Sequence, residues 1–572
     1  MSGTDPDNLQ HDTYEIVLQL IELRSTSSNG SDLLRSITTL LHPVLFALFP
    51  VVALLGRNIE MIRPAEAIRP TVLIVGAVML IVLFARVGLK DWGKGALAGT
   101  FIIVWSFAFG QIRQLLPIDD SGPEAAPIQL GLFLFWFASI AVVLLLLDRS
   151  RVIPPKLHFV LAAAGLAAIA QPFARLVAHE VEARKPFTIS SIQETVVPYR
   201  PQQAAERRPD VYYLVLDSYG RADVLDEIYE ASNRDFLGQL EGRGFLVADE
   251  SMSNYAQTSL SFASTLNMTY LEEVGQIAGS DSSQREVARL IRFSEVESIL
   301  RELGYTVMAF STGYRRAELS NADLFFDARP RQVSPFEALL LESSALWGAV
   351  YTPAFFGQEV TFPGYAAYRS RLLANIDALM RSIEITGPKF VFAHLLIPHP
   401  PFVLGSSGDP VEPALPFSVA DGDQFPGSAA DYTTGYRNQV AFANEVVVEF
   451  LDILKDSGKP SVVIIQGDHG PGLRLDWADP DRTDKWERHS ILNAVRADGL
   501  KSSSVDESMS PVNTFRLLFN HLFNAHYPLL QNQSFFSSWR APYEFIEVPP
   551  HPGKDQATSW DLPDWTHSSE GT

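Results

Sequence analysis

The sequence contains no cysteine. This absence excludes disulfide bonds, thiolate catalysis and zinc sites with cysteine ligands. Any bound metal would therefore need carboxylates, histidines or hydroxyl oxygens as ligands. The absence is compatible with an oxidising compartment but does not establish one.

Positive charge is also scarce, because 45 Lys and Arg stand against 66 Asp and Glu, for a net charge of -21. Nucleic-acid binding depends on clustered basic side chains that neutralise phosphates. We therefore expect no nucleic-acid partner. Residues 1–35 also lack the basic start, short apolar run and cleavage site of a signal peptide, and we interpret them as a cytoplasmic lead-in.

The N-terminal third contains several long apolar runs, although the mean hydropathy of the whole chain is only +0.07. Five runs approach the roughly 20 residues that span a bilayer as a helix. A single run of this kind could be a buried core helix, but five in succession predict a membrane domain over residues 36–176. The runs are Ser36 to Gly56, Pro70 to Ala85, Gly95 to Ile112, Pro127 to Leu147 and Leu157 to Ala174.

The charges between these runs indicate how the chain is oriented. If residue 1 starts inside, eight basic residues lie in or beside inner loops and four in outer loops, as the positive-inside rule requires. We therefore predict a multi-pass protein of the cytoplasmic (inner) membrane with its soluble part on the extracytoplasmic side. The inner set is Arg24, Arg35, Arg86, Lys90, Lys94, Arg149, Arg151 and Lys156, and the outer set is Arg57, Arg63, Arg69 and Arg113.

A chain of 572 residues exceeds what one hydrophobic core supports, so further domains are expected. We predict a linker over 177–208, a soluble domain over 209–548 and a disordered tail over 549–572. Continuous apolar runs at Val211 to Leu216, Val391 to Leu396 and Ser461 to Ile465 are typical of strands buried on both faces. Helical patterns at 286–303, 365–385 and 436–454 lie between or beside them, so the predicted fold is α/β with a mostly parallel central sheet.

Polar residues follow each of the three predicted strands. Asp217 comes after the first, His399 after the second, and Asp468 with His469 after the third. The carboxyl ends of parallel strands are where sites form in such sheets, and Asp with His suits a divalent cation. Taken alone, Asp217 could equally be a turn or helix-cap residue.

Several segments, in this order, resemble the alkaline phosphatase and sulfatase superfamily. The resemblance covers roughly Pro209 to Asn520 and is closest to the membrane-anchored branch that includes lipoteichoic acid synthase, with five N-terminal helices before an extracytoplasmic catalytic domain. The segments are PDVYYLVLDSYGR, NYAQTSLSFASTLNM, FVFAHLLIPHPPF, VVIIQGDHGPG, ERHSILNA and SPVNTFRLLFN.

The resemblance implies a divalent metal, Mn, Zn or Mg, with Asp217, Thr258, Asp468 and His469 as ligands. It further implies Thr258 as the covalent nucleophile, since metal coordination can activate a hydroxyl. Ser259 is the alternative nucleophile, and Thr258 could instead cap the helix that follows. No second carboxylate adjoins Asp217, so one metal is favoured over two.

Other residues are candidates for binding substrate. His399 could protonate the leaving alcohol or bind an oxyanion, or it could simply order a proline-rich loop. Arg315, Arg316 and Arg488 could clamp an anion, and His489 follows Arg488 where the superfamily places a site residue. His394 falls within a predicted strand and is assigned a structural role.

The departures from the superfamily narrow the function. Typical sulfatases carry Cys or Ser followed by x-Pro-x-Arg, and this sequence has no such motif. The residues after Thr258 also lack an acidic side chain that lipoteichoic acid synthases have there. The sequence therefore predicts a membrane-anchored enzyme that cleaves or transfers phosphate esters of the phosphoglycerol or phosphoethanolamine type. Its substrates would be a lipid head group, such as that of phosphatidylglycerol or phosphatidylethanolamine, or an envelope glycan. The alternatives are a sulfatase without formylglycine and an inactive binding protein.

Overall fold

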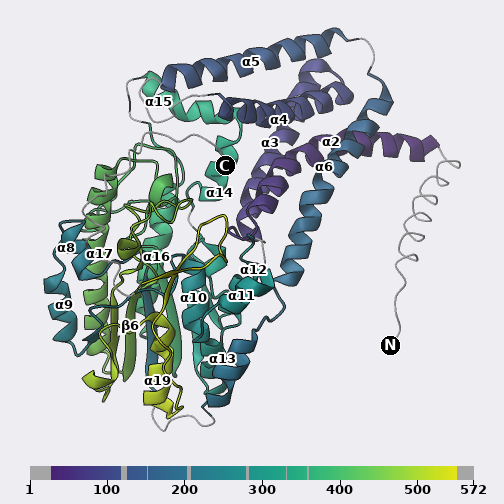
Figure 1. The fold of residues 1–572 in the computed structure, drawn as a ribbon. Coiled ribbons are helices and arrows are strands. Elements are labelled where there is room, and N and C mark those ends of the chain that lie inside the picture. The colour runs from purple at the N-terminus through teal and green to yellow at the C-terminus, as the bar shows by residue number, and fades with distance from the viewer. Residues whose placement is uncertain are drawn as a thin grey trace, which may run out of the picture. The chain divides into compact units, whose positions relative to one another are not determined.

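The computed structural model describes residues 28–116, 125–150, 153–201, 208–278, 282–329, 331–356, 358 and 360–549. The chain divides into two compact units (Figure 1). One comprises the chain up to Asn58, Pro64–Ala178 and Leu339–Glu359, and the other comprises Ile59–Arg63, His179–Ala338 and the chain from Val360 onward. The predicted lead-in up to residue 27 and the predicted tail from residue 550 lie outside the described residues.

The first unit holds long apolar helices. Five of its described helices are long and apolar enough to cross a membrane: Ile37–Arg57, Pro64–Leu89, Trp92–Arg113, Ala126–Arg149 and Pro155–Glu182. Each contains most of one predicted run, so the prediction of five membrane helices is confirmed. The helices themselves are α2 (Ser28–Arg57), α3 (Ile68–Leu89), α4 (Trp92–Gln114), α5 (Ala125–Arg149) and α6 (Pro155–Glu182), with the short helix η2 (Pro64–Ala67) before α3.

Small residues and one polar cluster hold this unit together. A Cβ at Gly95 of α4 would lie 2.7 Å from the carbonyl oxygen of Val82, so glycine allows α3 and α4 to pack backbone to backbone. His42 of α2 contacts Thr100 of α4 through Nδ1 at 2.6 Å and His158 of α6 through Nε2 at 2.9 Å. These contacts satisfy polar groups that would otherwise be costly among apolar helices.

The two units exchange short segments of the chain. The segment Leu339–Glu359 belongs to the unit of apolar helices, although it falls inside the range predicted for the soluble domain. It contains the end of α14 (Pro335–Glu342), η5 (Ala345–Tyr351) and α15 (Thr352–Phe355). The segment packs closely against α5, because a Cβ at Gly348 would lie only 2.7 Å from the Cβ of Phe133. Conversely, Met61, from the stretch between α2 and α3, accepts a hydrogen bond from the Arg315 amide at 3.0 Å within the soluble unit.

A seven-stranded sheet forms the centre of the soluble unit, with strand order β2-β7-β6-β1-β5-β3-β4. The five strands from β6 to β4 are parallel, whereas β7 and β2 are antiparallel to their neighbours. The mostly parallel α/β sheet is thus confirmed. The strands are β1 (Asp210–Leu216), β2 (Leu246–Val247), β3 (Thr306–Phe310), β4 (Leu324–Phe326), β5 (Lys389–Leu395), β6 (Ser461–Gly467) and β7 (Asn493–Arg496), and β8 (Ser534–Phe536) pairs separately with β9 (Ile546–Val548).

Helices cover both faces of this sheet (Figure 1). Every residue of β1 is buried, and its two adjacent tyrosines point in opposite directions. The Tyr212 ring packs on Phe450 of α17, and the Tyr213 ring packs on Phe515 of α19, with centroids 5.2 and 5.3 Å apart. Burial on both faces explains why the strand sequence is a continuous apolar run instead of an alternating one.

The helices of the soluble unit broadly follow the predicted patterns. The pattern predicted over 286–303 is divided into two helices, because Ser294 caps the second one by accepting a hydrogen bond from the Glu297 amide. The helices are α7 (Ser190–Thr195), α8 (Ala222–Glu227), α9 (Arg234–Glu241), α10 (Thr258–Asn267), α11 (Glu272–Ala278), α12 (Arg285–Arg292), α13 (Glu295–Glu302), α16 (Tyr365–Ser382), α17 (Ala429–Asp456), α18 (Lys485–His489) and α19 (Thr514–Phe523), with short η3 (Val197–Tyr199), η4 (Arg315–Ala317), η6 (Gly422–Gln424), η7 (Ser502–Ser504) and η8 (Pro511–Asn513).

Candidate metal centre

The two central strands bring the candidate ligands together. β1 and β6 are parallel neighbours, with Leu216 opposite Gly467, so the residues that follow them emerge side by side. Asp217, Asp468 and His469 are buried, and one ligand atom from each lies within 4.8 Å of the others. The adjacency was expected from the carboxyl ends of neighbouring parallel strands.

The glycines on either side of the Asp468-His469 pair are required by close backbone contacts. A Cβ at Gly467 would lie 2.5 Å from the Tyr219 carbonyl oxygen, and a Cβ at Gly470 would lie 2.0 Å from that of Glu487. No side chain fits at either position without moving the main chain. Gly467 therefore allows the end of β6 to lie against the loop after β1, and Gly470 allows the loop after β6 to lie against α18 (Lys485–His489).

Ser218 occupies an uncommon conformation beside the cluster. Its φ is +64°, in the left-handed region that costs a non-glycine residue about 1 kcal/mol or more. In this conformation its amide donates to Asp468 Oδ1 at 3.1 Å. Its carbonyl oxygen accepts from the Tyr436 hydroxyl at 2.8 Å, which fixes the turn. One oxygen of Asp468 is thus held by the protein.

Asp217 is oriented by a histidine on the neighbouring strand. His394 of β5 lies opposite Val215 of β1, and its Nε2 is 2.8 Å from Asp217 Oδ2. This contact leaves Asp217 Oδ1 on the side of His469, 3.7 Å from its Nε2. Burial would raise the pKa of Asp217, but the charge of His399 and the hydrogen bond with His394 outweigh burial and hold the pKa below its ordinary value. Asp217 is therefore a carboxylate.

His469 presents a lone pair to the centre of the cluster. Its Nδ1 lies 2.9 Å from the Gly470 carbonyl oxygen, which can only accept, so Nδ1 carries the proton and Nε2 does not. Burial, and after it the charge of Arg488, lower the pKa of His469 and favour this neutral form. Nε2 lies 3.1 Å from the Thr258 hydroxyl oxygen and 3.3 Å from Asp468 Oδ2.

This set of donors fits a divalent cation. Asp468 Oδ2 is buried and has no hydrogen-bond partner among the described residues. It faces the unprotonated Nε2 of His469, so neither atom supplies a proton to the other. Buried carboxylates without compensation are costly, and carboxylate oxygens with an imidazole nitrogen are suitable ligands for Zn or Mn.

Thr258 reaches the cluster from the first turn of α10. Gln257 occupies the N-cap position, so Thr258 does not cap this helix. The neighbouring Ser259 hydroxyl donates to Gln284 Oε1 instead and takes no part in the cluster. Of the two candidate nucleophiles, Thr258 is therefore the one placed beside His469.

Arg488 is buried next to the cluster and anchored by several acceptors. Its Nη1 donates to Asp421 Oδ2 at 2.8 Å and to the Gly470 carbonyl oxygen at 3.1 Å, and its Nε donates to that of Ala256 at 3.0 Å. Its Nη2 lies 3.3 Å from His469 Nε2. The guanidinium thus places a fixed positive charge at the edge of the centre.

His399 approaches the same oxygen of Asp421 that Arg488 binds. Its Nε2 is 3.9 Å from Asp421 Oδ2, and its ring centroid is 6.4 Å from that of His469. Burial would lower the pKa of His399, but the charges of Asp217 and Asp421 outweigh burial and raise it above the ordinary value. A protonated imidazole is therefore favoured at this position.

The remaining predicted substrate residues are placed differently. His489 is buried, with Nδ1 3.2 Å from the Ser253 carbonyl oxygen, and its Nε2 has no partner among the described residues. Arg315 does not face the metal cluster, because its guanidinium donates to the Ile59 carbonyl oxygen at 2.7 Å and to Glu180 at 2.5 Å.

Two residues near the centre were missed from the sequence. Asp421, the partner of Arg488, lies in a stretch that follows no strand, so no pattern marked it. His394 was assigned a structural role because it falls within a strand, yet its side chain orients Asp217. A single polar residue in an otherwise apolar buried strand is the signal that could have identified it.

Comparison with solved structures gives distant likenesses. The C-terminal periplasmic domain of EptC from Escherichia coli is 13% identical, with a TM-score of 0.38, 62% of this chain covered and 98% of that one. The integral membrane lipooligosaccharide phosphoethanolamine transferase A from Neisseria meningitidis is 13% identical, with a TM-score of 0.35 and coverage of 84% and 95%. A 2-O GAG sulfatase is 11% identical, with a TM-score of 0.37 and coverage of 58% and 77%. At these scores the likenesses do not bear on what this chain binds or transforms.

Comparison with curated proteins finds no match. The family model described as Sulfatase, in contrast, matches residues 209–515. This match confirms the predicted relationship and the prediction of an enzyme of the alkaline phosphatase and sulfatase superfamily. Because the match spans more than half of the 572 residues, the chain belongs to the Sulfatase family.

Proposed function

We propose that this protein is a metal-dependent enzyme that cleaves or transfers phosphate esters, with Thr258 as its covalent nucleophile. The observation that carries the proposal is the position of the Thr258 hydroxyl, 3.1 Å from Nε2 of His469, which itself clusters with the buried Asp217 and Asp468. Asp217, Asp468, His469 and Thr258 would hold one divalent ion. When bound, such an ion lowers the pKa of a hydroxyl ligand and neutralises charge on phosphate oxygens.

The protein's own groups would divide the remaining work. Thr258 would release its hydroxyl proton to water once an ion lowered its pKa, and Oγ would then attack phosphorus. The bond from phosphorus to the ester oxygen would break, and its electron pair would remain on that oxygen. His399, in its protonated form, gives a proton to the departing alcohol. Arg488, fixed by Asp421, offers Nη2 to an oxygen of the phosphate. His489 Nε2 is a further candidate contact for substrate.

The resulting phosphothreonine ester would be resolved by a hydroxyl group of a lipid or glycan, or by water. Five candidate membrane spans hold the catalytic unit close to lipid, which raises the effective concentration of a head group. We therefore favour a phospholipid donor of the phosphoglycerol or phosphoethanolamine type. The loop charges favour the outer face of the cytoplasmic membrane as the place of reaction.

The arrangement favours an enzyme over a binding module. A protein that only recognised a glycan would have no physical reason to bury Asp217 and Asp468, which are 3% and 1% exposed. Each buried carboxylate costs stability unless a cation or hydrogen-bond donor compensates it. Such a cost is characteristic of catalytic centres.

The test uses the full chain in detergent with Mn or Zn and two chromogenic esters, bis-p-nitrophenyl phosphate and p-nitrophenyl sulfate. We expect turnover of the phosphodiester and a mass increase on the Thr258 peptide. Thr258→Ala should lower turnover by about 1,000-fold or more and abolish the adduct, whereas Thr258→Ser, which keeps a hydroxyl, should retain part of both.

Other outcomes would contradict the proposal in different ways. Turnover of the sulfate ester alone would support a sulfatase that works without formylglycine. Full activity in Thr258→Ala would exclude this nucleophile. A wild-type chain that binds no metal and forms no adduct would be a binding protein with the fold of an enzyme.

A further inference from the structure

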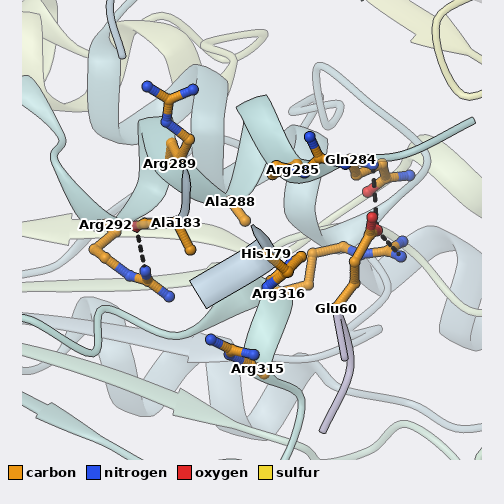
Figure 2. A pocket seen from close by; sticks show the side chains of 10 residues that line it. All are labelled: Glu60, His179, Ala183, Gln284, Arg285, Ala288, Arg289, Arg292, Arg315 and Arg316. Carbon is orange, nitrogen blue, oxygen red and sulfur yellow. Dashed lines mark hydrogen bonds and ion pairs between the residues drawn. The ribbon is translucent and has the colours of Figure 1, made fainter. Parts of the chain in front are cut away.

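A hollow in the soluble unit is lined by arginines (Figure 2). It has an empty volume of about 310 Å³, part of which is open to solvent. Five of its ten lining residues are arginines, in a protein whose net charge is -21. We call this hollow the arginine pocket, and its lining consists of Glu60, His179, Ala183, Gln284, Arg285, Ala288, Arg289, Arg292, Arg315 and Arg316.

Helix α12 supplies three of the arginines from one face. Arg285, Arg289 and Arg292 are spaced by four and then three residues, which places them on the same side of an α-helix. Side chains of like charge at this spacing repel one another. The helix therefore presents a basic face for which an anion would be a stabilising partner.

Carboxylates compensate only some of these arginines. Arg316 pairs with Glu60 at 2.9 Å, Arg315 with Glu180 at 2.5 Å and Arg289 with Glu182 at 3.4 Å. These three pairs leave Arg285 and Arg292 as the remaining arginines of the pocket.

Arg285 and Arg292 form no ion pair with a carboxylate among the described residues. Arg292 donates one hydrogen bond to the Ala183 carbonyl oxygen, seen in Figure 2, and the guanidinium of Arg285 has no hydrogen-bond or ion-pair partner among the described residues. The Nε atoms of Arg285, Arg292 and Arg316 are buried without a hydrogen-bond partner in that part of the chain. Buried donors of this kind normally have an acceptor, so the pocket lacks acceptors for the donors that it contains.

The crowding of positive charge has an electrostatic consequence. Burial, and after it the charge of Arg315, lower the pKa of Arg292. A bound anion would offset both effects.

The chain that lines the pocket adjoins two candidate membrane spans. Glu60 follows the span that ends at Arg57 by three residues, and His179 lies in the last turn of the span that ends at Glu182. Chain connectivity therefore keeps these pocket residues within a few residues of apolar helix. Phosphates of lipid head groups are the abundant anions at that level of a membrane.

Gln284 connects the arginine pocket to the candidate nucleophile. In the pocket, its backbone amide lies 3.4 Å from Glu60 Oε2. On the other side, its Nε2 donates to the Gln257 side chain at 2.6 Å, and Gln257 directly precedes Thr258. A group held in the pocket would thus lie one side chain away from the first turn of α10.

We propose that the arginine pocket is an anion site that binds the phosphate group of a phospholipid head group or free phosphate, with Arg285 and Arg292 as its unpaired cations. Guanidinium groups bind phosphate oxygens through directed pairs of hydrogen bonds. The proposal concerns binding alone and does not require Thr258 to react.

The experiment measures binding to the full chain in maltoside detergent with EDTA present, so that no metal contributes. The probes are monomeric dihexanoyl phosphatidylglycerol and inorganic phosphate, followed by calorimetry at low ionic strength. The variants are Arg285→Gln and Arg285→Gln/Arg292→Gln. The matched control is Arg234→Gln/Arg381→Gln, which removes two arginines whose side chains are 84% and 62% exposed.

We expect the double pocket variant to weaken binding of the lipid by about ten-fold or more, and Arg285→Gln alone to weaken it by several-fold. The control and Asp468→Asn should bind as the wild type does, and the Asp468 variant separates this site from the metal centre. Binding of the lipid without phosphate assigns the site to head groups, and comparable binding of both assigns it to the phosphate anion from either source.

Unchanged affinity in both pocket variants, or no saturable binding of either probe by the wild type, would overturn the proposal. Arg285→Gln breaks no hydrogen bond or ion pair of the guanidinium among the described residues, so the fold of this variant should be intact. A thermal midpoint equal to that of the control checks this. If the double variant unfolds early, Arg285→Gln alone decides the result.

Discussion

The metal cluster and the arginine pocket belong to the same unit but have opposite charge imbalances. In the cluster, two carboxylates and an unprotonated imidazole nitrogen face one another in a buried space. In the pocket, five arginines line a partly open hollow, and only three of them pair with a carboxylate among the described residues. The difference teaches that the sign of the uncompensated charge predicts the sign of the missing ligand, a cation in one place and an anion in the other.

Removing an arginine should have very different costs in the two places. Arg488→Ala leaves Asp421 buried without its partner, so we expect the free energy of unfolding to fall by about 3–5 kcal/mol. Arg285→Ala, which breaks no ion pair, should change it by less than about 1 kcal/mol. Thermal unfolding of the full chain in detergent compares the two variants. If both variants lost the same free energy of unfolding, the buried ion pair of Arg488 with Asp421 would not be the cause of the expected difference.

The buried histidine His489, which follows Arg488, predicts that the stability of the protein depends on pH. Burial lowers the pKa of His489 to about 3, from an ordinary value of 6.5. Below pH 6.5 the unfolded chain takes up a proton at His489 that the folded chain does not, so stability should fall as pH decreases towards 3. We expect His489 to contribute a loss of a few kcal/mol across this interval.

The variant His489→Gln should therefore show a shallower decrease in thermal midpoint between pH 6.5 and the lowest pH at which the chain remains folded. His521→Gln, at an exposed position on α19, is the matched control and should follow the wild type. If the slope of the His489 variant equals that of the wild type, the buried imidazole is not the group that titrates.

A smaller effect is expected at Asp468, where the stability lost by burying a charge can be measured separately from the stability gained by binding a cation. In EDTA, Asp468→Asn removes an uncompensated buried charge, and we expect it to stabilise the chain by about 1–2 kcal/mol. With Zn or Mn added, the wild type should gain thermal stability and the variant should not. A variant that is less stable than the wild type in EDTA would contradict the electrostatic account of the cluster.

The sequence predicted the helices and strands that can be recognised from their own residues, without knowledge of their partners in the fold. Continuous apolar runs located the strands and membrane helices, because burial on all sides leaves little choice of side chain. Asp217 and Asp468 could be placed together because parallel neighbouring strands end at one edge of the sheet. Thr258 came from the resemblance and not from the pattern of residues.

Features that depend on distant pairing could not be predicted. Arg315 was a candidate substrate residue, but the structure pairs it with Glu180, which is far away in the sequence. Arg285 and Arg292 were not predicted as binding residues, because nothing in the sequence shows that they lack a carboxylate partner. Only the fold shows that they meet two further arginines from η4 around a hollow.

The exchange of segments between the two units also limits how the protein can be divided. A protein shortened to begin at Arg208 would lose Ile59–Arg63, whose Ile59 carbonyl oxygen is an acceptor for Arg315 and whose Glu60 pairs with Arg316. It would also retain Leu339–Glu359, with the tightly packed Trp347, in the absence of the helices on which that segment rests. A single cut therefore leaves neither unit with all of its segments.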